Sequence, residues 1–93
     1  MEKSEWTRQH PRRAQLVRRL NRQAFRIAKG FETAKLSAGE ALRLLERGKA
    51  VRQHALRASA QGGGITPEQN AALNRRLNRI GARLRFGLSR RPA

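Results

Sequence analysis

The segment 65–84, ITPEQNAALNRRLNRIGARL, decides the fold of the chain. Thr66 and Gln69 have the spacing of a capping box, and Pro67 occupies the first helical position, where its missing N–H costs nothing. Apolar residues then recur at intervals of four, three and four, which places them on one helix face. The segment therefore predicts an amphipathic helix over residues 67–86. Its apolar stripe consists of Leu73, Leu77, Ile80 and Leu84.

Two further helices are predicted upstream of this segment. The first covers residues 12–34, where apolar and basic residues separate onto opposite arcs of a helix. The second covers residues 38–60 and begins with another capping box, formed by Ser37 and Glu40. The glycine run 62–64 then breaks the chain before the third helix.

Each upstream helix has an apolar face that predicts burial. In the first helix this face consists of Leu16, Val17, Leu20, Ala24, Ile27, Ala28 and Phe31. In the second it consists of Ala41, Leu44, Leu45, Gly48, Val51, Ala55 and Ala58. The small residues around Gly48 predict a close approach to a neighbouring helix.

The chain has 93 residues, which is the size of one small domain. Three helices with short connections predict an all-α fold, either a three-helix antiparallel bundle or a long helical hairpin with a third helix packed on it. The domain is expected over residues 12–87, ended by Gly87. Residues 1–11 would form a flexible arm, in which Trp6 packs back onto the domain, and residues 88–93 a loose basic tail. The narrow third stripe also leaves room for self-association through a coiled-coil-like seam.

The charge of the chain is extreme. It carries 22 Lys and Arg against 6 acidic residues, a formal net charge of +16. Such a charge favours a polyanionic partner, which can be nucleic acid, an anionic membrane or an acidic protein surface. With no cysteine, the chain has no disulfide framework. No apolar run is long enough to span a bilayer, and the first residues lack the apolar segment of a secretory signal. We expect a cytoplasmic protein, or a periplasmic one if a signal peptide has been removed.

Catalytic chemistry has little support in the sequence. General acid–base catalysis needs a positioned histidine or carboxylate pair. His10 lies in the predicted arm, His54 falls on the solvent side of the second helix, and the glutamates are scattered. No set of His, Glu or Cys has the spacing of metal ligands. We therefore expect a protein that is not an enzyme, with no cofactor, metal or small-molecule substrate.

Basic residues on two helices form the candidate binding surface. Arginine side chains spread along a helix can contact successive phosphates without reading base sequence. The sequence therefore favours a protein that binds a polyanion, most simply nucleic acid. The predicted contact residues are Arg12, Arg18, Arg19, Arg22, Arg26, Lys29, Arg75, Arg76, Arg79 and Arg83.

Two phenylalanines lie among these arginines. Phe25 and Phe86 could stack on bases or anchor a protein partner. For Phe25 the alternative is packing on a neighbouring helix or on Trp6. The alternative function is a protein-binding module: a chaperone-like cradle, or an inhibitor or adaptor that docks on an acidic or nucleic-acid-handling partner.

Several short motifs carry a resemblance to known bacterial families. They are Arg26-Ile27 with Gly30, Leu36-Ser37 with Glu40-Ala41 and Leu44, and the segment 63–68 with Leu73. Over about residues 22–85 the chain thereby resembles small helical proteins of proteobacteria that carry repeated LTxxE capping motifs and have no settled function. Typical members have a secretion signal. The segment 65–69, ITPEQ, is also similar to the LTxxQ motif of periplasmic helical chaperones, which implies a basic cradle that binds unfolded clients.

Overall fold

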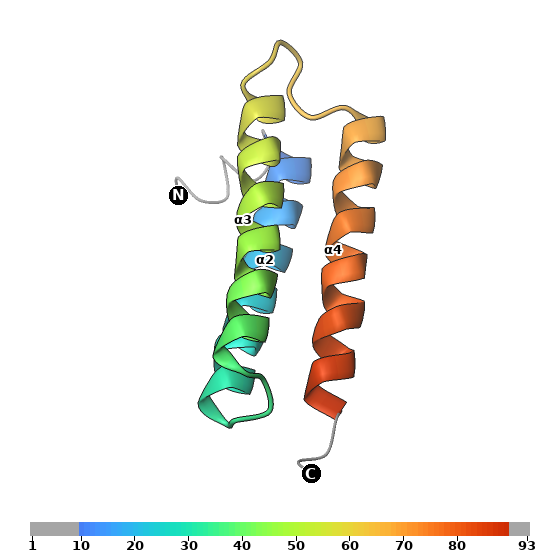
Figure 1. Cartoon of the computed structure of the whole chain (residues 1–93). Helices are drawn as coiled ribbons and strands as arrows, with labels where there is room; N and C mark the ends of the chain where they lie inside the picture. The colour runs from blue at the N-terminus through green and yellow to red at the C-terminus, as the bar shows by residue number, and fades with distance from the viewer. Residues whose placement is uncertain (1–9, 90–93) are drawn as a thin grey trace.

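The computed structural model describes residues 10–89, which form three helices and no strand. The helices are α2 (Pro11–Glu32), α3 (Ala38–Ser59) and α4 (Pro67–Ser89). Figure 1 shows them side by side, with α2 and α4 running in one direction and α3 in the other. Each helix packs against both of the others. The predicted all-α fold is confirmed, and its form is the three-helix bundle.

Capping boxes begin α3 and α4, as the sequence predicted. Ser37 Oγ accepts from the Glu40 N–H at 3.1 Å, while Glu40 Oε1 accepts from the Ser37 N–H at 3.0 Å. Thr66 and Gln69 make the same reciprocal pair at 3.1 and 2.9 Å. Each box satisfies two N–H groups that the first turn of a helix leaves without intrahelical partners. Local sequence therefore sets where these two helices start.

The end of α2 differs from the prediction. The helix stops at Glu32, because Ala34 adopts a left-handed backbone with φ of 61° and belongs to the turn. The Leu36 N–H donates to the Gly30 carbonyl at 3.0 Å and closes this turn. A Cβ on Gly30 would lie 2.8 Å from Leu36 Cδ1 and 2.8 Å from Leu88 Cδ2. Glycine therefore lets the turn and the end of α4 pack closely on α2.

The prediction that Gly87 ends the third helix is wrong. The helix α4 continues through this buried glycine to Ser89. Leu88 lies four residues beyond Leu84 and packs against the core. Its packing helps to offset the roughly 1 kcal/mol of helix propensity that a glycine loses. Residues 88 and 89 thus belong to α4, whereas residues 1–9, with Trp6, and residues 90–93 lie outside the described part of the chain.

One apolar cluster forms the core of the bundle. All four residues of the predicted α4 stripe are buried in it, which confirms that stripe. The two turns contribute Leu36 and Ile65, so the core extends to both ends of the bundle. The remaining members come from α2 and α3: Leu16, Leu20, Ile27, Ala41, Leu44, Val51, Ala55 and Ala58.

The buried faces of α2 and α3 are narrower than predicted. Phe31 and Leu45 are exposed, as are the alanines at 24 and 28. Gly48 is not a point of tight contact, because a Cβ there would meet only Leu20 Cδ2, at 3.7 Å. A hollow of about 170 Å³ lies beside it, between α2 and α3. Since both helices also pack on α4, their buried faces turn toward α4 and their outer edges stay uncovered.

Candidate functional site

Polar side chains spaced four residues apart hold α2 against α4. On α2 they are Gln15, Arg19 and Gln23, and on α4 they are Asn70, Asn74 and Asn78. Asn74 Oδ1 accepts from Arg19 Nη1 at 2.7 Å and from Gln15 Nε2 at 3.2 Å. Arg19 Nη2 donates to Asn78 Oδ1 at 2.9 Å, and Asn74 Nδ2 donates to the Asn70 carbonyl at 2.9 Å. We call these six residues the polar seam; its bonds fix the register of two parallel helices.

Two arginines predicted to contact nucleic acid instead form hydrogen bonds within the bundle, on the side where α2 meets α4. Arg19 is a member of the polar seam. Arg12 Nη1 donates to the backbone carbonyl of Ile65 at 2.9 Å, at the turn that leads into α4. Phosphate binding by either side chain would compete with these bonds. Both arginines therefore have a structural role that the charge pattern alone did not reveal.

Arginines from two helices line the opposite side of α4. Two neighbouring hollows of about 350 and 310 Å³ lie between α3 and α4 and share Arg47 and Arg83 in their walls. Apolar residues such as Leu44, Val51 and Ile80 line the same hollows. We call this feature the arginine groove. Its cationic residues are Arg43 and Arg47 on α3, and Arg76, Arg79 and Arg83 on α4.

Most guanidinium groups of the arginine groove form no hydrogen bond within the described part of the chain. Within residues 10–89, only Arg76 among the five forms a hydrogen bond, through Nη1 to the ring Nδ1 of exposed His54 at 3.3 Å. Glu40 is the only acid that lines the groove in this part of the chain, and its carboxylate already accepts from the Ser37 N–H. The groove therefore gathers positive charge on an apolar floor with few internal acceptors, an arrangement that attracts anions.

The other predicted basic residues are distributed over the rest of the surface. Arg22 and Arg26 line a separate hollow of about 240 Å³ between α2 and α4, together with Arg85. The remaining three, Arg18, Lys29 and Arg75, are exposed and line none of these hollows. The predicted set thus divides among the arginine groove, the polar seam, the contact of Arg12 with the Ile65 carbonyl, the smaller hollow and the open surface.

The two phenylalanines remain at the surface. The side chain of Phe25 is 68% exposed, so the expectation that it packs on a neighbouring helix is wrong. Phe86 is 63% exposed and lines the arginine groove beside Arg43 and Arg83. Of the two, only Phe86 stands next to several groove arginines, which makes it the better placed for an aromatic contact with a bound ligand.

Sequence reasoning did not select three arginines that line the hollows beside α4. Arg43 and Arg47 lie on the flank of α3 next to its buried face, and only the packing of α4 shows that they meet other arginines. Arg85 likewise joins the smaller hollow through the packing of α2. The spacing of Arg43 and Arg47 by four was a usable signal, since such residues share a helix face.

No group of three or more His, Cys, Asp or Glu that could hold a metal ion occurs within residues 10–89. None of the helices α2 to α4 is apolar enough along its length to cross a membrane. No protein-family model matches the chain, and neither the curated proteins nor the solved structures gave a match.

Proposed function

We propose that the protein binds nucleic acid through the arginine groove. The observation that carries this proposal is the convergence of five arginines from two helices on one groove, four of them without a hydrogen bond inside the described chain. Guanidinium groups bind phosphate oxygens in a bidentate geometry that lysine does not provide. An arginine-lined groove therefore suits a phosphate backbone better than it suits a single small anion.

The length of the groove is compatible with several phosphates. Arg76 and Arg83 are separated by about 10 Å along α4 at the helical rise of roughly 1.5 Å per residue. One strand of a duplex carries a phosphate about every 3.4 Å along the helix axis. The α4 side of the groove thus spans about three phosphates, and Arg43 and Arg47 contribute from the facing wall.

The proposal describes a binding protein that is not an enzyme. Contacts to phosphates alone give affinity with little sequence preference. Arg22, Arg26 and Arg85 lie on the other flank of α4 and could extend the contact around that helix. Binding to an acidic protein is the second candidate, and it is favoured by a different surface of the bundle, where exposed leucines of α3 flank Lys49 and Arg52.

The first test measures binding to a mixed-sequence duplex and to single-stranded RNA between about 50 and 200 mM salt. We expect the logarithm of the binding constant to fall linearly with the logarithm of salt concentration. The slope should correspond to several released counterions. Absence of binding to both nucleic acids at the lowest salt would overturn the proposal.

The second test separates the groove from the overall charge. The variant R43Q/R47Q/R79Q/R83Q removes four groove cations, whereas R18Q/K29Q/R57Q/R75Q removes four exposed cations elsewhere. The groove variant should reduce the salt slope by about three for single strands, at roughly 0.7 per lost contact. The control variant has the same net charge and should lose much less affinity. Equal losses would show that net charge, and not the groove, holds the nucleic acid.

A further inference from the structure

The faces of α2 and α3 that turn away from α4 carry a row of exposed apolar side chains. Leu42 is 60% exposed and Leu56 is 42% exposed. Leu45 is 40% exposed and lines the hollow beside Gly48. Phe31, near the end of α2, is also exposed and lies at the same end of the bundle as Leu42. Several large apolar side chains exposed on one side of a small domain are typical of an interaction site.

A single stripe on α3 organises this surface. Leu42, Leu45, Lys49, Arg52 and Leu56 follow one another at spacings of three or four, so they lie on one helix face. The stripe is about 21 Å long at the rise of an α-helix. It is apolar at both ends and cationic in the middle. Its spacing is that of a seam between two packed helices.

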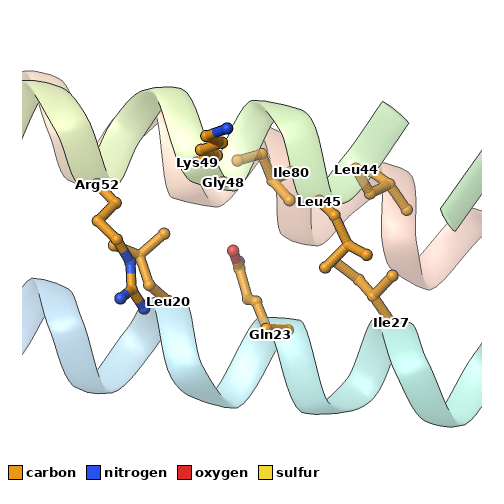
Figure 2. Close-up of a pocket in the computed structure, with 10 residues that line it drawn as sticks. Leu20, Gln23, Ile27, Leu44, Leu45, Gly48, Lys49, Arg52 and Ile80 are labelled. Carbon is orange, nitrogen blue, oxygen red and sulfur yellow. The ribbon is translucent and has the colours of Figure 1, made fainter. Parts of the chain in front are cut away.

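The middle of the stripe borders the hollow between α2 and α3. Figure 2 shows Leu45 and Arg52 reaching from α3 toward α2, and the amide of Gln23 pointing from α2 into the same space. Gln23 Nε2 donates to the Leu77 carbonyl at 2.8 Å, but its Oε1 is buried and has no hydrogen-bond partner among residues 10–89. A buried acceptor without a donor is a local cost to the stability of the bundle.

Charge determines which occupant fits this surface. Among residues 10–89, those that line the hollow include Lys49 and Arg52 and no acid. Arg52 Nη2 donates to Asn21 Oδ1 at 2.9 Å. Asn21 is a neutral acceptor, so the bond leaves the charge of Arg52 without a counterion in the described part of the chain. A second copy of this chain is a poor occupant, because symmetric pairing of the stripe would set Lys49 against Lys49. The chain as a whole carries +16.

We propose that the α2–α3 face binds an amphipathic helix of a protein partner, with leucine-like side chains at both ends of its contact stripe and acidic residues at its centre. The apolar ends would cover Leu42 and Leu56. The acidic centre would face Lys49 and Arg52. A helix laid into a groove is a common mode of peptide recognition, and the opposite charges fix its register. This surface is separate from the arginine groove, so the protein could hold nucleic acid and a partner helix together.

The test uses three synthetic peptides of about 18 residues, long enough to be partly helical. The acidic peptide carries leucines at the two ends of one stripe and two glutamates at its centre. A second peptide has lysines in place of the glutamates, and a third has alanines in place of the leucines. Binding to the full chain is measured by fluorescence anisotropy at about 0.15 M salt, where distant charges are screened. We expect only the acidic, leucine-bearing peptide to bind.

Variants of the chain decide where that peptide binds. L42S/L56S should weaken the acidic peptide at least tenfold, and K49E/R52E should transfer preference to the lysine peptide. The matched control R47E/R83E reverses two charges in the arginine groove and should change peptide affinity less than threefold. Circular dichroism confirms that each variant folds.

Three outcomes would overturn the proposal. The first is no binding by the acidic peptide at any accessible concentration. The second is equal loss of binding in the control variant, which would place the peptide in the arginine groove. The third is a dimer, detected by sedimentation, that L42S/L56S converts to a monomer, since the occupant would then be a second copy. Because none of these readouts uses nucleic acid, failure here is distinguishable from failure of the proposed function.

Discussion

Arg19 on one side of α4 and the groove arginines on the other side have opposite roles. Toward α2, Arg19 is half-buried and donates to two asparagine side chains of the polar seam. Toward α3, Arg47 and Arg83 line an open groove in which arginine faces arginine. The residue type is the same, and the difference lies in what the neighbouring helix offers. An amide oxygen can accept a hydrogen bond from a guanidinium group, whereas a second guanidinium cannot.

This comparison shows that charge content alone does not identify a binding surface. An arginine with good internal acceptors stabilises the fold and gives up part of its capacity for a ligand. One that faces like charge keeps that capacity and costs stability. Variants in the polar seam should therefore change mainly the stability of the fold, whereas variants in the arginine groove should change mainly the affinity for nucleic acid.

The largest expected effect on stability comes from truncating a core residue of α4, the helix that carries both the polar seam and the arginine groove. Leu77 lies at the centre of the α4 stripe and is 0% exposed. L77A leaves a cavity and should lower the free energy of unfolding by about 2–5 kcal/mol. Both the seam and the groove depend on α4, so nucleic-acid binding should be lost together with helicity as the variant unfolds. Urea unfolding followed by circular dichroism measures the change, and a loss below about 1 kcal/mol would contradict a core position for Leu77.

The second largest expected loss of stability is confined to the polar seam. Asn74 Oδ1 accepts from both Arg19 and Gln15, and N74A leaves these part-buried donors without that acceptor. We expect a loss of about 1–3 kcal/mol in the free energy of unfolding. Nucleic-acid affinity per folded molecule should not change. The control is N78A, which removes one exposed bond from Arg19 and should cost less. If N74A instead weakened binding without destabilising the fold, the seam would belong to the ligand site.

Local features of this fold were predictable from the sequence. The capping boxes at Ser37 and Thr66 and the α4 stripe depend on residues within a few positions of each other, and the structure confirms them. The helix end assigned to Gly87 was wrong because a tertiary contact, the packing of Leu88 on the core, carries α4 further. Phe31 and Leu45 were assigned to the interior because their wheel positions do not show which edge a neighbouring helix covers.

The candidate site was predictable only in part. A helical wheel identifies basic arcs, and it placed Arg76, Arg79 and Arg83 together on the third helix. It does not show which arcs meet, so Arg43 and Arg47 were not selected and Arg12 and Arg19 were. The asparagines at 70, 74 and 78 were a readable signal, because polar residues spaced by four beside an apolar stripe indicate a polar helix contact.

A smaller effect is expected at the start of α4, which both sides share. T66A removes the hydroxyl that accepts from the Gln69 N–H and should lower the free energy of unfolding by about 1 kcal/mol. S37A makes the equivalent change at the start of α3 and should cost a similar amount. Helicity near each cap, followed by hydrogen exchange, should fall only at the mutated helix. Equal fraying of both helices would show that the two caps are coupled and not local.

The smallest expected effect is a gain in stability. It tests most directly the contrast between Arg19 and the groove arginines. Arg43 with Arg47, and Arg79 with Arg83, are like-charged pairs spaced by four, each of which destabilises a helix by about 0.2–0.5 kcal/mol. The variant R43Q/R47Q/R79Q/R83Q should therefore raise the free energy of unfolding by about 0.5–1 kcal/mol while it loses nucleic-acid affinity.

Urea unfolding at low and high salt measures this gain, which should shrink as salt screens the repulsion. R19Q provides the contrast, because it also removes positive charge but should destabilise the fold by breaking the seam. If the groove variant proved less stable than the native chain, its arginines would be holding α3 to α4. The two sides of α4 would then differ in geometry but not in role, and the groove would no longer be the preferred place for a phosphate backbone.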